Sequence, residues 1–144
     1  MGKGEGEGGR GRENAECVSE EDMEKRRRDI EELKERMKRF GLAIIRLVET
    51  LPSGRVVSLI SNQMVRSGTS AGANYRAACR ARSKADFISK MGIVEEELDE
   101  TLYWLEVLQE AGLLSRQKAE WLMREGDELL GIVVSSIRTA RRDS

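Results

Sequence analysis

The chain has 144 residues, a formal net charge of −1, 35% charged residues and 4% aromatic residues. This length favours a single domain, and the near-neutral charge provides no overall field that would attract nucleic acid or an anionic membrane. With one proline and many charged residues, the composition favours long exposed helices over a sheet.

The chain contains two cysteines, Cys17 and Cys79, and no histidine. Two widely spaced cysteines make neither a disulfide framework nor a zinc site, so both are interpreted as free thiols in a reducing compartment. No apolar run approaches the ~18 residues that span a bilayer, and the N-terminus has no segment of signal type. These features predict a cytoplasmic protein without a membrane partner.

Residues 1–18 hold six of the 14 glycines, mixed with charged side chains. Such a segment cannot bury enough apolar area to offset the entropy lost on ordering, so it is predicted to be a disordered tail. A single folded domain is expected over residues 19–144.

The first helix is predicted to begin near Ser19, because Ser19 and Asp22 have the spacing of a capping box. Pro52 is expected to end it, since the residue before a proline is driven out of the α region. Between these limits, apolar residues recur at alternating intervals of three and four, as in a heptad seam. Its members are Ile30, Leu33, Met37, Phe40, Ile44, Leu47 and Leu51.

Three more helices are predicted. The second runs over about residues 53–80, the third opens at a second capping box of Ser83 and Asp86 and ends before Gly112, and the fourth is capped by Ser115. The apolar seams of the third and fourth helices are Phe87, Met91, Val94, Leu98, Leu102 and Leu105, then Leu122, Gly126, Leu129, Val133, Ile137 and Ala140. Long helices joined by short loops predict an all-α, antiparallel, up-down-up-down four-helix bundle.

The second helix carries three stripes when its residues are placed at 100° intervals. The first, apolar stripe contains Ile60, Met64, Ala71 and Ala78, flanked by Val57 and Tyr75. A polar stripe contains Gln63, Ser67, Ser70 and Asn74, and a basic stripe contains Arg55, Arg66, Arg76 and Arg80. Gly68 and Gly72 cost helix propensity, which indicates close approach of another helix. The polar stripe is interpreted as a hydrogen-bond network inside the bundle or at a subunit contact, with a ligand groove as the alternative.

The third and fourth helices have apolar side chains on a second side. Ile93, Trp104, Val107 and Leu108 are expected to point away from the third seam, and Trp121 and Ile132 from the fourth. A helix that is apolar on two sides is covered on two sides, so these residues predict a homo-oligomer. The expected interface residues are Gly68, Gly72, Asn74, Ile93, Trp104, Val107 and Trp121.

Charge is divided into two blocks. Residues 55–90 hold seven basic residues and one acid, and residues 95–110 hold seven acids and no base. These blocks can pair head to tail between subunits, in a contact that closes into a ring where the rotation permits, or attract one another within one bundle. The acidic block lacks the histidines and the four inward-facing carboxylates of a di-iron bundle, so no metal, cofactor, small-molecule substrate or catalytic centre is expected.

Three motifs support a family resemblance: RSGTSAGAN at residues 66–74, SKADFISK at residues 83–90 and ELDETLYWL at residues 97–105. Through them, the chain from about residue 30 to residue 142 resembles the four-helix-bundle proteins encoded in intervening sequences of bacterial 23S ribosomal RNA genes. The resemblance implies a ring-shaped, pentamer-like assembly. Some members of that family are accessory proteins of diversity-generating retroelements, which implies RNA, DNA or a reverse transcriptase as partner.

Two functions follow from these patterns. The first is a non-enzymatic, ring-forming scaffold or adaptor in the cytoplasm. The alternative is a nucleic-acid-binding accessory protein in which Arg55, Arg66, Arg76 and Arg80 follow a phosphate backbone. The near-neutral net charge and the acidic block of nearly equal size favour the first.

Overall fold

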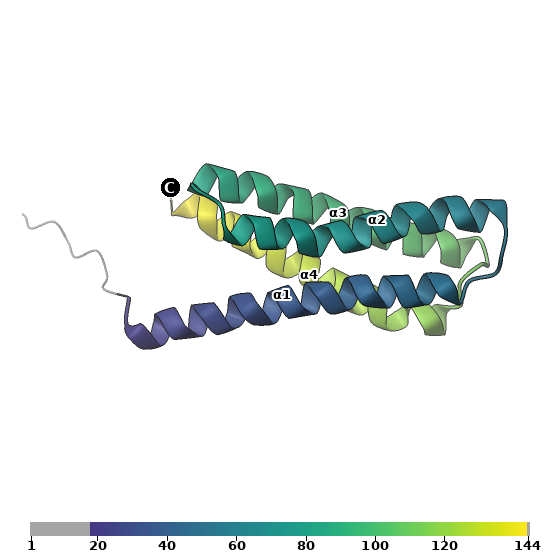
Figure 1. Cartoon of the computed structure of the whole chain (residues 1–144), viewed down its shortest axis with the longest axis horizontal. Helices are drawn as coiled ribbons and strands as arrows, with labels where there is room; N and C mark the ends of the chain where they lie inside the picture. Colours follow the sequence, from purple (N-terminus) through teal and green to yellow (C-terminus); the bar gives the residue numbers. More distant parts are fainter. Residues whose placement is uncertain (1–17, 144) are drawn as a thin grey trace, which may run out of the picture.

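A computed structural model describes residues 18–143 as four long helices in antiparallel order (Figure 1). These are α1 (Glu20–Glu49), α2 (Arg55–Cys79), α3 (Lys84–Glu110) and α4 (Arg116–Arg142). The predicted all-α four-helix bundle is therefore confirmed. The described part of the chain does not include residues 1–17. The predicted disordered tail, apart from residue 18, and the thiol of Cys17 therefore lie outside the described residues.

Three of the helices begin at the serines that the sequence indicates. The Ser19 hydroxyl accepts a hydrogen bond from the Asp22 N–H at 3.1 Å, and the Ser83 hydroxyl accepts one from the Asp86 N–H at 3.0 Å. Ser115 caps α4 in the same way through the Lys118 N–H, at 3.2 Å. Each bond satisfies one of the N–H groups that a helix start leaves without a partner. Gly112, with φ 73°, adopts the left-handed conformation that ends α3.

The core lies along the predicted seams. Phe40, Ile44, Val94, Leu98 and Leu105 are completely buried, and the α4 seam is buried from Leu122 to Ile137. None of the helices in residues 18–143 is both long and apolar enough to cross a bilayer. Burial of one stripe on each of four helices accounts for the fold.

Two apolar residues lie where the periodicity did not place them. Ile30, expected in the core, is 38% exposed because it lines a pocket that opens where α1 diverges from α2 and α4. Leu108, expected on an outer face, is completely buried. The chain folds back over it after α3, since the Leu113 and Leu114 N–H groups both donate to the Leu108 carbonyl, at 2.9 and 3.2 Å.

Helices α1 and α2 approach closely at glycines. A Cβ atom added at Gly41 would lie 3.2 Å from the carbonyl oxygen of Gly68, and one added at Gly68 would lie 3.0 Å from Cγ1 of Ile44. The close approach expected from the small residues of α2 therefore occurs within one chain. At Gly72 the nearest atom, Cβ of Met37, would be 3.4 Å away, an ordinary contact distance.

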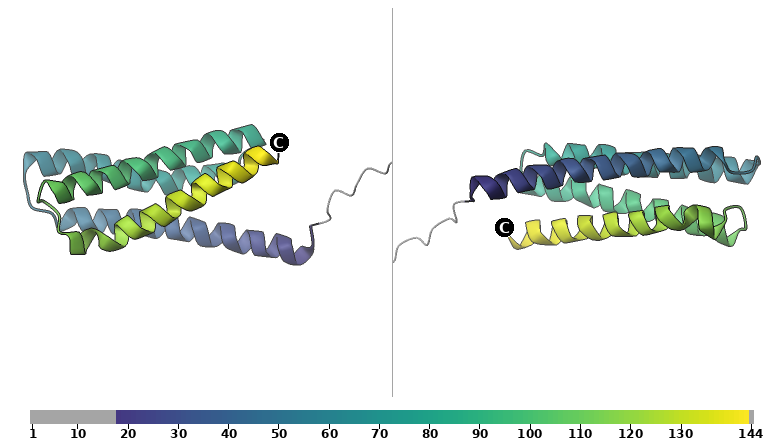
Figure 2. Two further views of the ribbon diagram at one scale, coloured as in Figure 1. Left: turned by 180° about the vertical axis from the view of Figure 1, so that it is seen from behind. Right: turned by 90° about the horizontal axis from the view of Figure 1, so that it is seen from below.

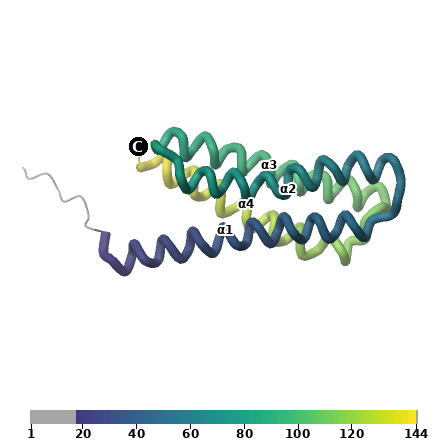
Figure 3. Tube along the Cα trace, in the orientation of Figure 1, coloured from purple at the N-terminus to yellow at the C-terminus, as the bar shows by residue number. Residues whose placement is uncertain are grey.

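Helix α4 contacts α3 along its length but diverges from α1, as the two views of Figure 2 and the trace in Figure 3 show. Where they are still close, Arg36 of α1 pairs with Glu125 of α4 and, at 3.0 Å, with Glu128. Beyond this cluster a pocket of about 380 Å³ opens between α1, α2 and α4, beside Tyr75 and Ile132. Burial and the charges of Cys79 and Glu31 raise the pKa of the Tyr75 hydroxyl.

Two glycines of similar helical context provide a test of the α1–α2 contact. Gly131 of α4 is exposed, and a methyl group added there would meet no atom within 4 Å, so Gly131→Ala should stabilise the fold by about 0.5–1 kcal/mol through helix propensity. Gly41→Ala should lose that gain because its methyl group meets backbone atoms of α2. Urea denaturation of both variants measures the difference. Equal stabilisation by the two changes would show that α1 and α2 separate without cost.

Candidate functional site

A buried hydrogen bond sets the register between α2 and α3. The hydroxyl oxygens of Ser67 and Thr101 lie 2.7 Å apart, and both residues are completely buried. Each oxygen also lies near a carbonyl of its own helix, Met64 at 3.3 Å and Glu97 at 2.8 Å. Every hydroxyl proton therefore has an acceptor, as burial requires.

Two further members of the polar stripe are bonded to each other within α2. The Asn74 side-chain amide donates to both the carbonyl and the hydroxyl of Ser70, each at 2.9 Å. Gln63 is exposed. Within the stripe, only the Ser67 hydroxyl therefore bonds a side chain of another helix.

Arg66 connects the basic block to the acidic block inside one chain. Its guanidinium lies 3.2 Å from a Glu97 oxygen and 2.6 Å from a Glu100 oxygen. Glu100 also accepts a hydrogen bond from the Trp104 indole N–H at 3.2 Å. The hydrogen bond from Arg66, opposed by desolvation and helped by Trp104, lowers the pKa of Glu100. The charge pattern left open pairing between subunits or within one bundle, and Arg66 pairs within one bundle.

The ion pair identifies a continuous outer surface on α2 and α3. Leu59 and Arg66 are seven residues apart and share one face of α2, while Ile93, Glu100 and Val107 share one face of α3 in the same way. The Arg66–Glu100 contact shows that these two faces adjoin. We call this surface the α2–α3 outer face; its members are Val56, Leu59, Arg66, Ile93, Glu100, Trp104 and Val107.

The antiparallel register places four of the seven predicted interface residues on or beside this face. Asn74 lies level with Ile93, and Trp104 and Val107 lie toward the end of α3. The other three lie elsewhere. Gly68 is buried against Ile44 and Gly72 faces Met37 in the same chain, whereas Trp121 is exposed on α4.

Sequence reasoning did not select the most exposed apolar side chains of this face. Val56 is 60% exposed and Leu59 is 59% exposed, on the same side of α2 as Arg66. Tyr103, 56% exposed, borders the face and stacks edge-on against Trp104, with ring centroids 5.1 Å apart. The sequence did contain an indication of this surface, because Val56 and Leu59 are apolar, lie outside the core stripe of α2 and are one helical turn apart.

The four arginines of the predicted stripe do not form one continuous basic surface along α2. Arg55 lies at the first residue of α2, Arg66 is held by two carboxylates, and Arg76 and Arg80 lie at the far end of the helix. Among residues 18–143, no group of three or more metal-ligating side chains has the arrangement of a metal site. The acidic run instead divides between Glu97 and Glu100, which bind Arg66, and exposed carboxylates such as Glu96.

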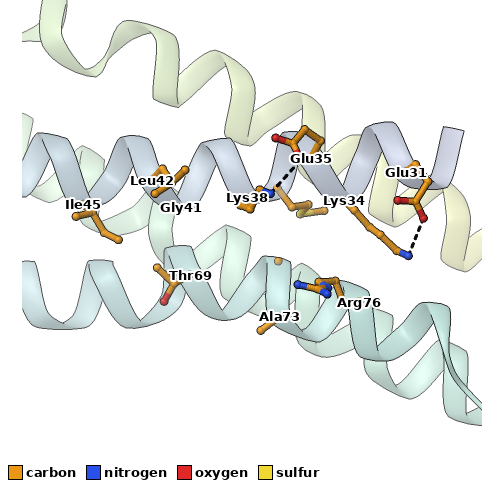
Figure 4. Close-up of a pocket in the computed structure, with 12 residues that line it drawn as sticks. Glu31, Lys34, Glu35, Lys38, Gly41, Leu42, Ile45, Thr69, Ala73 and Arg76 are labelled. Carbon is orange, nitrogen blue, oxygen red and sulfur yellow. Dashed lines mark hydrogen bonds and ion pairs between the residues drawn. The ribbon is translucent and has the colours of Figure 1, made fainter. Parts of the chain in front are cut away.

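A groove of about 450 Å³ runs between α1 and α2 on another side of the bundle (Figure 4). Small residues, Gly41, Gly72 and Ala73, line it together with charged side chains from both helices. Lys34 pairs with Glu31 at 2.9 Å and Lys38 with Glu35 at 3.2 Å, so most of its charges are neutralised along α1. The Thr69 hydroxyl donates to the Val65 carbonyl at 2.7 Å rather than into the groove.

The geometry defines a class of protein: an antiparallel four-helix bundle with a partly apolar outer face on α2 and α3. The family model of the 23S rRNA-intervening sequence protein matches residues 28–135, and the chain belongs to this family. A crystal structure of a protein of unknown function from the S23 ribosomal protein family of Bacteroides thetaiotaomicron has 34% sequence identity and a TM-score of 0.66. The alignment covers 73% of this chain and 97% of that one. Among curated proteins, none matches this chain.

The Arg66 ion pair makes stability depend on pH. Because the pKa of Glu100 is lower in the folded protein than in the unfolded chain, the pair stabilises the fold above the ordinary pKa of a glutamate. This contribution is lost as the pH falls through the lowered pKa. Arg66→Gln should therefore lower the melting temperature at about pH 7 and lower it less at about pH 3.

Arg39→Gln is the matched control, since Arg39 is exposed in the middle of α1 and has no ion-pair partner among the described residues. It should leave the melting temperature unchanged at both pH values. A loss of stability in Arg66→Gln that is the same at both pH values would contradict a role for the ion pair.

Proposed function

We propose that the protein is a non-enzymatic, homo-oligomeric scaffold whose copies join through the α2–α3 outer face. The observation that carries the proposal is the exposure of Val56, Leu59 and Tyr103 around the half-buried Trp104. Large apolar side chains grouped on one face of a small bundle are typical of a protein–protein contact. Aromatic residues of this kind contribute most of the affinity in such contacts.

The polar centre of the face is compatible with burial in a contact. Arg66 is already hydrogen-bonded to Glu97 and Glu100, so each of the three charged groups keeps a partner when covered, and the cluster's net charge of −1 would be balanced by a basic group of the next copy. Ile93 lies on one side of this centre, and Trp104 and Val107 lie on the other.

A head-to-tail ring is part of the proposal. Beside the face, α3 exposes carboxylates that have no oppositely charged partner among residues 18–143: Glu96, Asp99, Glu106 and Glu110. A basic surface of the next copy would complement them, and such a heterologous contact closes into a ring where the rotation permits. The pentamer-like count and a cytoplasmic location come from the family resemblance and the sequence, and a reverse transcriptase partner remains a prediction.

Light scattering tests the assembly at about 50 µM protein, a concentration well above the dissociation constant of a specific contact. The wild-type chain should have a mass several times 16.2 kDa. Leu59→Glu should shift the mass to that of the monomer, because a charge would be buried against apolar groups. Since Leu59 is exposed in the single chain, the variant should keep its helical circular dichroism.

Leu42→Glu introduces the same charge at an exposed leucine of the α1–α2 groove and serves as the control. It should leave the mass unchanged. A monomeric wild type, or equal dissociation by both variants, would exclude the α2–α3 outer face as the contact.

A further inference from the structure

One end of the bundle collects basic side chains from two distant parts of the sequence. The turn between α2 and α3 and the end of α4 lie side by side there, as Figures 1 and 3 show. The Lys84 ammonium joins them by donating to the Asp143 carbonyl. We call this surface the basic end; its members, all exposed, are Arg76, Arg80, Arg82, Lys84, Arg138, Arg141 and Arg142.

The basic end is strongly charged although the whole chain is nearly neutral. The segments 76–90 and 138–143 contain eight basic residues and two acids, a balance of +6. One of the acids, Asp86, is held by Lys90 at 2.7 Å, and this hydrogen bond lowers its pKa. The side chains of Arg76, Arg80, Arg138 and Arg142 have no ion-pair partner among residues 18–143.

Helix dipoles explain only part of this concentration. Arg76 lies in the last turn of α2, and Arg141 and Arg142 lie in the last turn of α4, where a positive charge is favourable. Lys84 is the first residue of α3 and Arg82 precedes it, so the dipole of α3 opposes both charges. Repulsion among the remaining cations also opposes folding, and an anionic partner would remove it.

We propose that the basic end binds the phosphodiester backbone of a nucleic acid. Six of its seven members are arginines, whose planar guanidinium groups match phosphate oxygens in a bidentate manner. None of the large exposed apolar residues lies within residues 76–90 or 138–143, so these segments offer neither an insertion into lipid nor an apolar groove for a peptide. Contacts to phosphates alone hold a nucleic acid without reading its sequence.

The proposed head-to-tail ring also requires a basic surface, so a loss of nucleic-acid binding must be distinguished from a loss of assembly. Leu59 and Val56 lie toward the opposite end of α2, at the connection from α1. Charge changes at the basic end therefore leave the apolar part of the α2–α3 outer face intact, and binding can be measured alongside the oligomeric mass.

The test uses the full chain and fluorescence anisotropy with a labelled RNA duplex and a DNA duplex of the same sequence. Affinity should fall with salt at a log–log slope of about −0.9 per phosphate contacted. Arg80→Glu combined with Arg138→Glu should weaken binding by at least roughly tenfold at about 100 mM salt and make the slope shallower. The neutral pair Arg80→Gln and Arg138→Gln should give a smaller loss in the same direction.

The control pair is Arg46→Glu with Arg116→Glu, two exposed arginines outside the basic end and with the same change in net charge. It should keep nearly the wild-type affinity. Equal affinity for both duplexes would show that the protein recognises the phosphodiester backbone that RNA and DNA share. Tighter binding of the RNA duplex would identify RNA as the ligand. No binding of either duplex, equal losses in both reversed pairs, or equally tight binding to phosphatidylserine vesicles would overturn the proposal.

Discussion

The close contact of α2 with its two neighbours determines the arrangement of the bundle. On one side, Gly41 and Gly68 let the backbones of α1 and α2 approach to a distance that a side chain would prevent. On the other side, the Ser67–Thr101 hydrogen bond fixes how far α2 and α3 slide along each other. Because this register brings Arg66 to Glu100, it also decides which side chains form the α2–α3 outer face. A shift by one helical turn would place Leu59 and Trp104 beside different partners.

Much of the fold could be predicted because its signals are local. A serine three residues before an acidic residue marks a helix start through its own backbone bond, as Ser19 and Ser83 show. Apolar residues at intervals of three and four mark the buried side of each helix in the same way. The exceptions lie near helix ends. Whether Ile30 or Leu108 is covered depends on where α1 diverges from α2 and α4 and on where the loop after α3 returns.

The functional surfaces were less predictable because they depend on two helices at once. The stripe of arginines on α2 looked like one surface along one helix. The structure divides it, since α3 supplies carboxylates to Arg66, while α4 brings further arginines beside Arg80. Residues 80–84 and 138–142 are far apart in the chain, and no periodicity within either segment indicates that they meet. Likewise, Val56 and Leu59 become part of a surface only when Trp104 and Val107 lie beside them.

The extension of α1 beyond its neighbours has a consequence for how the molecule opens. From Glu20 to Glu32 every side chain is exposed, so this part of the helix gains almost nothing from tertiary packing. Its stability depends on the Ser19 cap and on local pairs such as Arg27 with Glu24. A free helix of fewer than about 12–15 residues is marginal in water. The first turns of α1 therefore form a separate unit that unwinds and reforms while the bundle stays folded, with amide protons that exchange long before those of the core.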